Sequence, residues 1–125
     1  MTQTSPHQLL VVDDDDQVRR LLVTVLQREG FTVRAAIDAD QALQMLDSDR
    51  VDLMLLDLHM PGPADGEDLL YLLRDRGDAV PIIVVSGWVD DEAVINRPDC
   101  VQAVIKKPIN IKELVAIVRD HLPPN

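Results

Sequence analysis

The chain alternates between two patterns of hydrophobic residues. Five short apolar runs have the length of buried strands: "LLVV" from Leu9, "FTVRAA" from Phe31, "VDLMLL" from Val51, "VPIIVVS" from Val80 and "VQAVI" from Val101. Between these runs, apolar residues recur at intervals of three and four positions, which is the period of a helix that buries one face. The alternation predicts strands that are each followed by a helix.

The predicted helices have recognisable ends. Gly30 ends the first and Gly77 the third, a short fourth helix near residues 90–96 is closed by Pro98, and Asn110 caps the fifth. The expected core-facing residues are Val18, Leu21, Leu22, Val25 and Leu26 in the first helix, Ala39, Ala42, Leu43 and Leu46 in the second, Leu69, Leu70 and Leu73 in the third, and Ile111, Leu114, Val115, Val118 and Leu122 in the fifth.

Five strands alternating with five helices predict a doubly wound α/β fold, because right-handed crossovers place helices on both faces of a parallel sheet. In such folds, ligands bind beyond the carboxyl ends of the strands, near the point where the strand order reverses. Polar residues follow four of the five predicted strands at that edge, and they are Asp13, Asp14, Asp57, Ser86, Lys106 and Lys107. The second strand offers no comparable residue.

Composition narrows the function classes. A chain of 125 residues fits one domain, and its net charge of −10 argues against a protein that binds nucleic-acid phosphates directly. The single cysteine excludes an internal disulfide and fits a reducing cytoplasm. No apolar run approaches the ~20 residues of a membrane span, and the N-terminal residues are polar. We therefore expect a cytoplasmic domain that makes no membrane contact.

The residues at the strand ends suit phosphoryl transfer. Carboxylates gathered at one edge repel one another unless a cation lies between them, and Mg²⁺ prefers oxygen ligands of this kind. Asp57 can then act as the nucleophile and form an acyl phosphate, whose charge the Ser86 hydroxyl and the Lys107 ammonium share with the metal. Asp15 and Asp16 are interpreted as helix-capping or solvent-facing residues, and Lys106 as a solvated neighbour of Lys107.

At these residues the sequence resembles the receiver domain of bacterial two-component response regulators. The resemblance extends from Leu9 to Leu122 and rests on four motifs in the family's order. The motifs are "VVDD" with Asp13 and Asp14, "LLDLHMP" with Asp57 and Pro61, "IIVVSG" with Ser86 and Gly87, and "IKKP" with Lys107 and Pro108. The resemblance implies a flavodoxin-like sheet of strand order 2-1-3-4-5, in one receiver domain over residues 1–125. Its core would be residues 8–122, with a polar tail at 1–7 and a possible linker beginning at 123–125.

The resemblance also implies roles for single residues. Asp57 would accept phosphate from a histidine kinase or a histidine phosphotransfer protein. Asp14 would ligate Mg²⁺ directly, Asp13 would act largely through water, and the backbone carbonyl of His59 would complete the protein ligands. The domain would be a signalling module that promotes its own phosphorylation and dephosphorylation, and a downstream effector or a fused output domain would read its state.

Further expectations concern the Lys-Pro motif and three departures from the family pattern. The resemblance implies a cis peptide bond between Lys107 and Pro108. Val104 stands where the family often has a Tyr or Phe that rotates during signalling, so that device cannot operate here. The loop between Met60 and Gly66 is one residue longer than the common pattern, and the fourth helix is short.

Two alternative functions remain open at this stage. A phosphohydrolase of the haloacid dehalogenase type also uses a strand-end aspartate, and Asp13 and Asp15 have its nucleophile spacing. That family, however, places its nucleophile first and its acidic pair last, which is the reverse of the order seen here. The other alternative is a pseudo-receiver, a binding module that has the same fold and is not phosphorylated.

Overall fold

The computed structural model describes residues 6–58, 66–87 and 101–123. The strands are β1 (Gln8–Val12), β2 (Thr32–Ala36), β3 (Leu53–Leu56), β4 (Ile82–Ser86) and β5 (Val101–Lys106). The helices in the described ranges are α1 (Asp16–Arg28), α2 (Ala39–Ser48), α3 (Gly66–Asp75) and α5 (Ile111–His121). The fourth predicted helix, near residues 90–96, lies outside the described residues.

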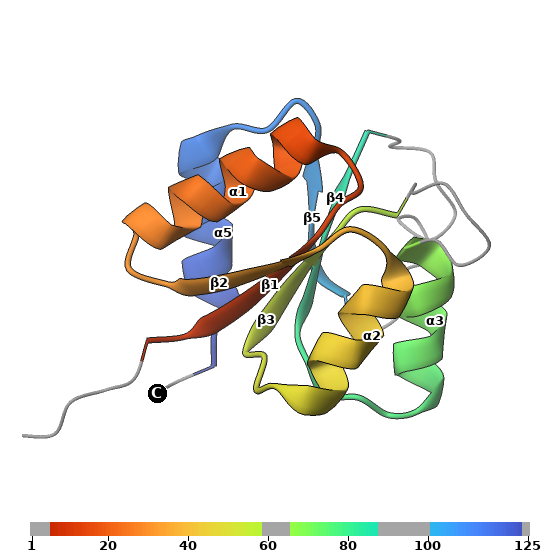
Figure 1. Cartoon of the computed structure of the whole chain (residues 1–125). Helices are drawn as coiled ribbons and strands as arrows, with labels where there is room; N and C mark the ends of the chain where they lie inside the picture. The colour runs from red at the N-terminus through yellow and green to blue at the C-terminus, as the bar shows by residue number, and fades with distance from the viewer. Residues whose placement is uncertain (1–5, 59–65, 88–100, 124–125) are drawn as a thin grey trace, which may run out of the picture.

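The strands form one parallel sheet in the order β2-β1-β3-β4-β5. Helices α1 and α5 cover one face of this sheet, and α2 and α3 cover the other (Figure 1). The predicted doubly wound fold and its strand order are thus confirmed. The strand order reverses between β1 and β3, which places the expected ligand-binding edge at their carboxyl ends.

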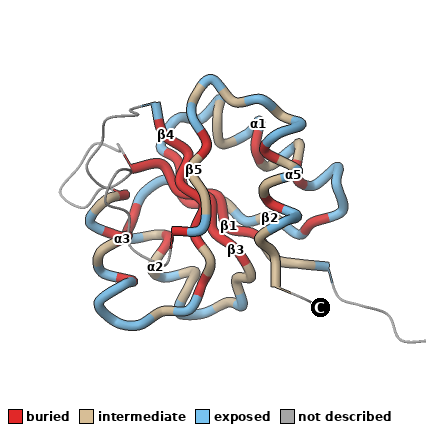
Figure 2. Tube along the Cα trace, turned by 180° about the vertical axis from the view of Figure 1, so that it is seen from behind, coloured by how far each residue is buried: buried red, intermediate tan, exposed pale blue. Residues whose placement is uncertain are grey.

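The core consists of two layers, one on each face of the sheet. Alternate residues of β1 point to opposite faces, so that Leu10 packs in the layer with α2 and α3, whereas Leu9 packs in the layer with α1 and α5. The central strands β1, β3 and β4 are covered on both sides and are buried along most of their length (Figure 2). This double burial explains why their sequences are continuous apolar runs rather than alternating ones.

In the described ranges, the predicted ends of α1, α3 and α5 are found where the sequence placed them; the predicted end at Pro98 lies outside these ranges. The Asp15 carboxylate caps α1 by accepting from the backbone N–H groups of Gln17 and Val18, and the Asn110 side chain caps α5. Gly30 follows α1 with a φ of 95° and Gly77 follows α3 with a φ of 70°, a backbone region that residues with a Cβ adopt only at a cost.

One core prediction is wrong. The helical period predicts that Leu21 faces the core, but its side chain is 45% exposed. Leu22 and Leu26 point at the sheet and are buried, and a neighbouring position on a helix lies about 100° around the axis. The half-buried Val23 packs in the same core layer as Leu22 and Leu26, so the face of α1 that meets the core is rotated toward Val23 and away from Leu21. No helix in the described ranges is long and apolar enough to cross a membrane.

Candidate functional site

Sheet hydrogen bonding continues past the strands and fixes the main chain of the strand-end residues. The Asp57 N–H donates to the Val12 carbonyl at 3.0 Å, and the Lys107 N–H donates to the Ser86 carbonyl at 2.9 Å. The Asp13 N–H donates to the Ala36 carbonyl at 3.2 Å. Residues from the ends of four strands are therefore held at one edge, as the topology predicts.

Three carboxylates converge at this edge. Asp13, Asp14 and Asp57 each contribute one carboxylate oxygen, and these atoms all lie within 4.8 Å of one another. Asp13 and Asp57 are buried, whereas Asp14 is exposed to solvent. A cluster of hard oxygen donors with one open side is the type of ligand set that Mg²⁺ accepts while it keeps several waters.

Lys107 lies between two of these carboxylates. Its Nζ is 3.2 Å from Oδ2 of Asp13 and 3.6 Å from Oδ2 of Asp57. The peptide bond between Lys107 and Pro108 is cis, as the resemblance implied. The neighbouring Lys106 is exposed, which agrees with its interpretation as a solvated residue. One ammonium therefore serves as the shared counter-charge of the two buried carboxylates.

The four consecutive aspartates have four different environments. Asp13 accepts a hydrogen bond at Oδ1 from the Asp15 N–H at 2.9 Å and faces Lys107 through Oδ2. Asp14 is open to solvent, and Asp15 caps α1. Asp16 is exposed and pairs with Arg19, whose hydrogen bond holds the pKa of that carboxyl below its ordinary value. The interpretation of Asp15 and Asp16 as capping or solvent-facing residues is thus confirmed.

Gly66 is a residue of the site that the sequence motifs did not indicate. It begins α3 and packs against the main chain that carries Asp57, so that an added Cβ would lie 2.7 Å from the Leu58 Cα and 2.8 Å from the Asp57 carbonyl carbon. Real Cβ atoms essentially never approach other atoms that closely. A glycine at the first residue of a helix was the available sequence signal.

Three further predicted features concern Ser86, His59 and Val104. Ser86 is the last residue of β4, is buried and bonds the main chain of Lys107, so it lies at the same edge. His59 and the loop that follows it lie outside the described residues. Val104 is partly buried against the core layer that contains α2 and α3.

Comparison with known proteins agrees with this arrangement. Residues 9–119 match the response regulator receiver domain family. The chain belongs to the response regulator receiver domain family.

Sequence relatives align with nearly the whole chain. It is 39% identical over 124 residues to the DNA-binding response regulator MtrA of Mycolicibacterium smegmatis, which is 98% of this chain and 53% of that protein. The chain therefore spans about half the length of the curated relatives it matches.

Solved structures of receivers show the same fold. A response regulator receiver protein from Pseudomonas putida is 30% identical with a TM-score of 0.85, over 94% of this chain and 99% of that one. The response regulator TrrA from Thermotoga maritima, solved in complex with Mg²⁺-BeF, is 28% identical with a TM-score of 0.81, over 93% and 99% of the two chains. The chain is accordingly a receiver domain of two-component signalling.

Proposed function

We propose that residues 8–122 form a single receiver domain in which Asp57 accepts a phosphoryl group from the phosphohistidine of a histidine kinase or a histidine phosphotransfer protein. The observation that supports this most directly is the convergence of Asp57 with two further carboxylates and the Lys107 ammonium at the carboxyl ends of the strands. A buried strand-end carboxylate with a purely structural role would not need two like charges beside it.

The carboxylates fit Mg²⁺ by the chemistry of their donor atoms. Asp14 and Asp57 would hold the ion directly, Asp13 would act largely through water, and the His59 carbonyl would be the remaining protein ligand. When bound, Mg²⁺ supplies positive charge that offsets the carboxylates and the oxygens of the incoming phosphoryl group. Asp14 is the exposed member, which suits the ligand that an ion entering from solvent meets first.

In the phosphoryl transfer, the main contribution of the protein is to position the reacting groups. A carboxylate oxygen of Asp57 forms a bond to phosphorus while the phosphorus–nitrogen bond of the donor breaks, and that bond's electron pair stays on the imidazole. The Lys107 ammonium and the Ser86 hydroxyl then donate to the phosphoryl oxygens. Lys107 lies 3.6 Å from Asp57 before the reaction, so only a short movement is required.

Phosphorylation would work as a switch because it changes which groups the Lys107 ammonium contacts. The acyl phosphate carries nearly two negative charges where the carboxylate carried one, and this would draw Lys107 away from Asp13. The main chain of Lys107 is bonded to Ser86, so the ends of β4 and β5 would respond together. Val104 supplies no aromatic ring to this movement, and the signal would therefore pass through the strand ends themselves.

A downstream effector protein or a fused output domain would bind according to the phosphorylation state of the receiver. The relatives named above include a DNA-binding response regulator about twice as long as this chain. In our proposal the receiver contacts neither nucleic acid nor membrane and works in the cytoplasm. It is a signalling domain that promotes its own phosphorylation and dephosphorylation, rather than an enzyme with a separate substrate.

Incubation with acetyl phosphate and Mg²⁺, followed by intact-protein mass spectrometry, tests the proposal. The wild-type protein should gain one phosphoryl group, and Asp57→Asn should gain none. A wild-type protein that binds Mg²⁺ but takes up no phosphate from acetyl phosphate or a phosphorylated kinase would be a pseudo-receiver. Repeated hydrolysis of a phosphate monoester would instead indicate a phosphohydrolase.

A further inference from the structure

Arg19 is a charged residue whose side chain is mostly covered. Only 14% of it is exposed, although it lies on the first turns of α1 beside an acidic loop. Its Nη1 donates to the backbone carbonyl of Asp13 at 2.9 Å, and its Nη2 donates to the carboxylate of Asp16. The planar guanidinium can hold both acceptors at once, which an ammonium cannot do with the same geometry.

The bond to the Asp13 carbonyl bears on Asp14. That carbonyl belongs to the peptide group joining Asp13 to Asp14, and the peptide group is rigid and planar. Fixing its oxygen sets the orientation of the whole plane, and with it the direction in which the Asp14 side chain leaves the main chain. Asp13 is held elsewhere by Asp15 and Lys107, whereas Asp14 itself is exposed.

We propose that Arg19 is a positioning residue for the metal site and orients Asp14 through the Asp13–Asp14 peptide plane. The inference rests on the proposed function, because it requires Asp14 to be a metal ligand. In physical terms, Arg19 orders part of the loop before the cation arrives, so that Asp14 already points toward Asp13 and Asp57.

Charge and geometry predict opposite results when Arg19 is removed. A guanidinium near an acidic site repels a divalent cation, so on charge alone its loss should leave Mg²⁺ affinity equal or slightly higher. If Arg19 orients Asp14, its loss should lower the affinity instead. Arg20 provides a matched control, because it is the next residue of the same helix, carries the same charge and is exposed.

Calorimetric titration with MgCl₂ of the folded, unphosphorylated protein tests the inference. Arg19→Met should weaken Mg²⁺ binding about tenfold, the scale usual for residues that orient metal ligands, while Arg20→Met should leave it unchanged or slightly tighter. In an Asp14→Asn background, Arg19→Met should lower the Mg²⁺ affinity little further, since its effect passes through Asp14. Arg19→Gln gives a second, polar variant should the Met protein fold poorly, and it should show the same loss.

The outcomes separate the inference from the proposed function. Arg19→Met and Arg20→Met with equal Mg²⁺ affinities would overturn the positioning role, while Mg²⁺ binding and phosphorylation of the wild-type protein would leave the function intact. The positioning role is also overturned if the losses from Arg19→Met and Asp14→Asn simply add. A wild-type protein that binds no Mg²⁺ would contradict the metal site itself. Lower stability of Arg19→Met without a change in Mg²⁺ affinity would show that the residue is only structural.

Discussion

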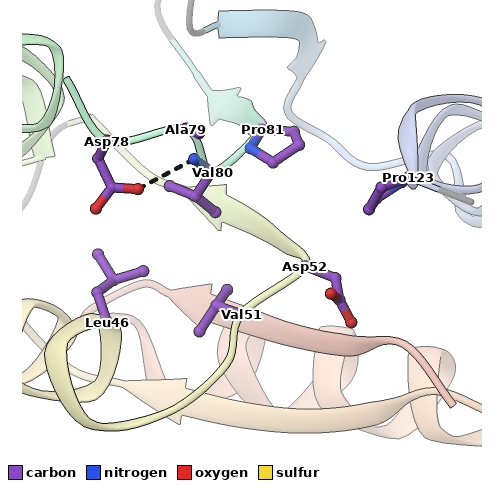
Figure 3. Close-up of a pocket in the computed structure, with 8 residues that line it drawn as sticks. All are labelled: Leu46, Val51, Asp52, Asp78, Ala79, Val80, Pro81 and Pro123. Carbon is purple, nitrogen blue, oxygen red and sulfur yellow. Dashed lines mark hydrogen bonds between the residues drawn. The ribbon is translucent and has the colours of Figure 1, made fainter. Parts of the chain in front are cut away.

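Both ends of the sheet carry aspartates, but the carboxylates have different partners at the two ends. At the carboxyl ends of the strands, Asp13 and Asp57 share the single ammonium of Lys107. At the amino ends, Asp52 accepts from the Gln8 N–H at 2.7 Å. Asp78 accepts from the Val80 N–H at 3.0 Å, as the dashed line in Figure 3 shows. Asp52 and Asp78 thus each have a main-chain donor of their own.

The surroundings of the amino-end carboxylates strengthen the contrast. Arg50 lies 3.1 Å from Asp52, and Arg76 lies 3.6 Å from Asp78, so each also has a nearby guanidinium. Both aspartates line a hollow of about 370 Å³ whose remaining walls are apolar, and in Figure 3 they lie on different walls of it. Asp52 and Asp78 are separated and each has its own main-chain donor, although Arg76 also pairs with Asp47, whereas the carboxylates proposed to perform chemistry are crowded and share one ammonium.

The largest expected effect is at the carboxyl-end edge, where Gly66 packs against Asp57. Gly66→Ala should lower the free energy of unfolding by about 3 kcal/mol, because the new Cβ meets main-chain atoms that cannot move aside cheaply. Urea denaturation measures this loss, and phosphorylation by acetyl phosphate should fall with it since the Asp57 main chain must shift.

Gly87 is the control for that substitution. It follows Ser86 at the same edge, but an added Cβ there would meet nothing within 4 Å. Gly87→Ala should therefore change the free energy of unfolding by less than about 0.5 kcal/mol, as surface substitutions usually do. Equal losses at the two glycines would mean that the contact between α3 and the Asp57 main chain does not limit stability.

At the amino-end edge, the expected effect is on stability alone. Asp52→Ala should lower the free energy of unfolding by about 2 kcal/mol, because it leaves the Gln8 N–H without its charged acceptor. Phosphorylation should proceed as in the wild-type protein. Asp47→Ala removes an exposed carboxylate that pairs only across the surface with Arg76, and it should cost less than about 1 kcal/mol. Loss of phosphorylation in Asp52→Ala would break the division between the two edges.

The sequence predicted one of these edges far better than the other. Residues that end parallel strands must meet at one edge, so Asp13, Asp57 and Lys107 could be grouped from the predicted strands alone. The helix caps were equally accessible, because Asp15 and Asn110 act on backbone N–H groups only a few residues away. The pairing of Asp52 with Gln8 was not predicted, since it joins residues 44 positions apart through a side chain.

The remaining misses have the same cause. Gly66 and Arg19 act on main-chain atoms of the loops that carry Asp57 and Asp13, and loop geometry is not encoded in a hydrophobic period. Leu21 was misplaced because Leu21, Leu22 and Val23 are all apolar, and the helical period alone does not say which side of Leu22 packs on the sheet. Sequence patterns therefore identify which residues can react, whereas the contacts that orient them depend on distances between residues far apart in the chain.

The smallest predicted effect is a gain in stability, whereas Gly66→Ala and Asp52→Ala should each lower the free energy of unfolding. Without divalent cations, Asp57→Asn should raise the free energy of unfolding by about 1 kcal/mol at low ionic strength. Among the residues that the structure describes, three carboxylates with oxygens within 4.8 Å lie beside one ammonium, so removing one negative charge should relieve more repulsion than the attraction it forfeits. Urea denaturation in the presence of a chelator measures the gain.

Mg²⁺ should reverse this order of stabilities. An ion that binds only the folded state stabilises it by about 1.4 kcal/mol when its concentration is tenfold above the dissociation constant, and Asp57→Asn has lost a proposed ligand. The wild-type protein should therefore gain more from added MgCl₂ than the variant does. Asp52→Ala keeps all three site carboxylates and should gain as much as the wild-type protein. If Asp57→Asn is instead less stable than the wild type without Mg²⁺, the Asp57 carboxylate is a net stabilising group like Asp52, and the two edges of the sheet do not differ in the way described.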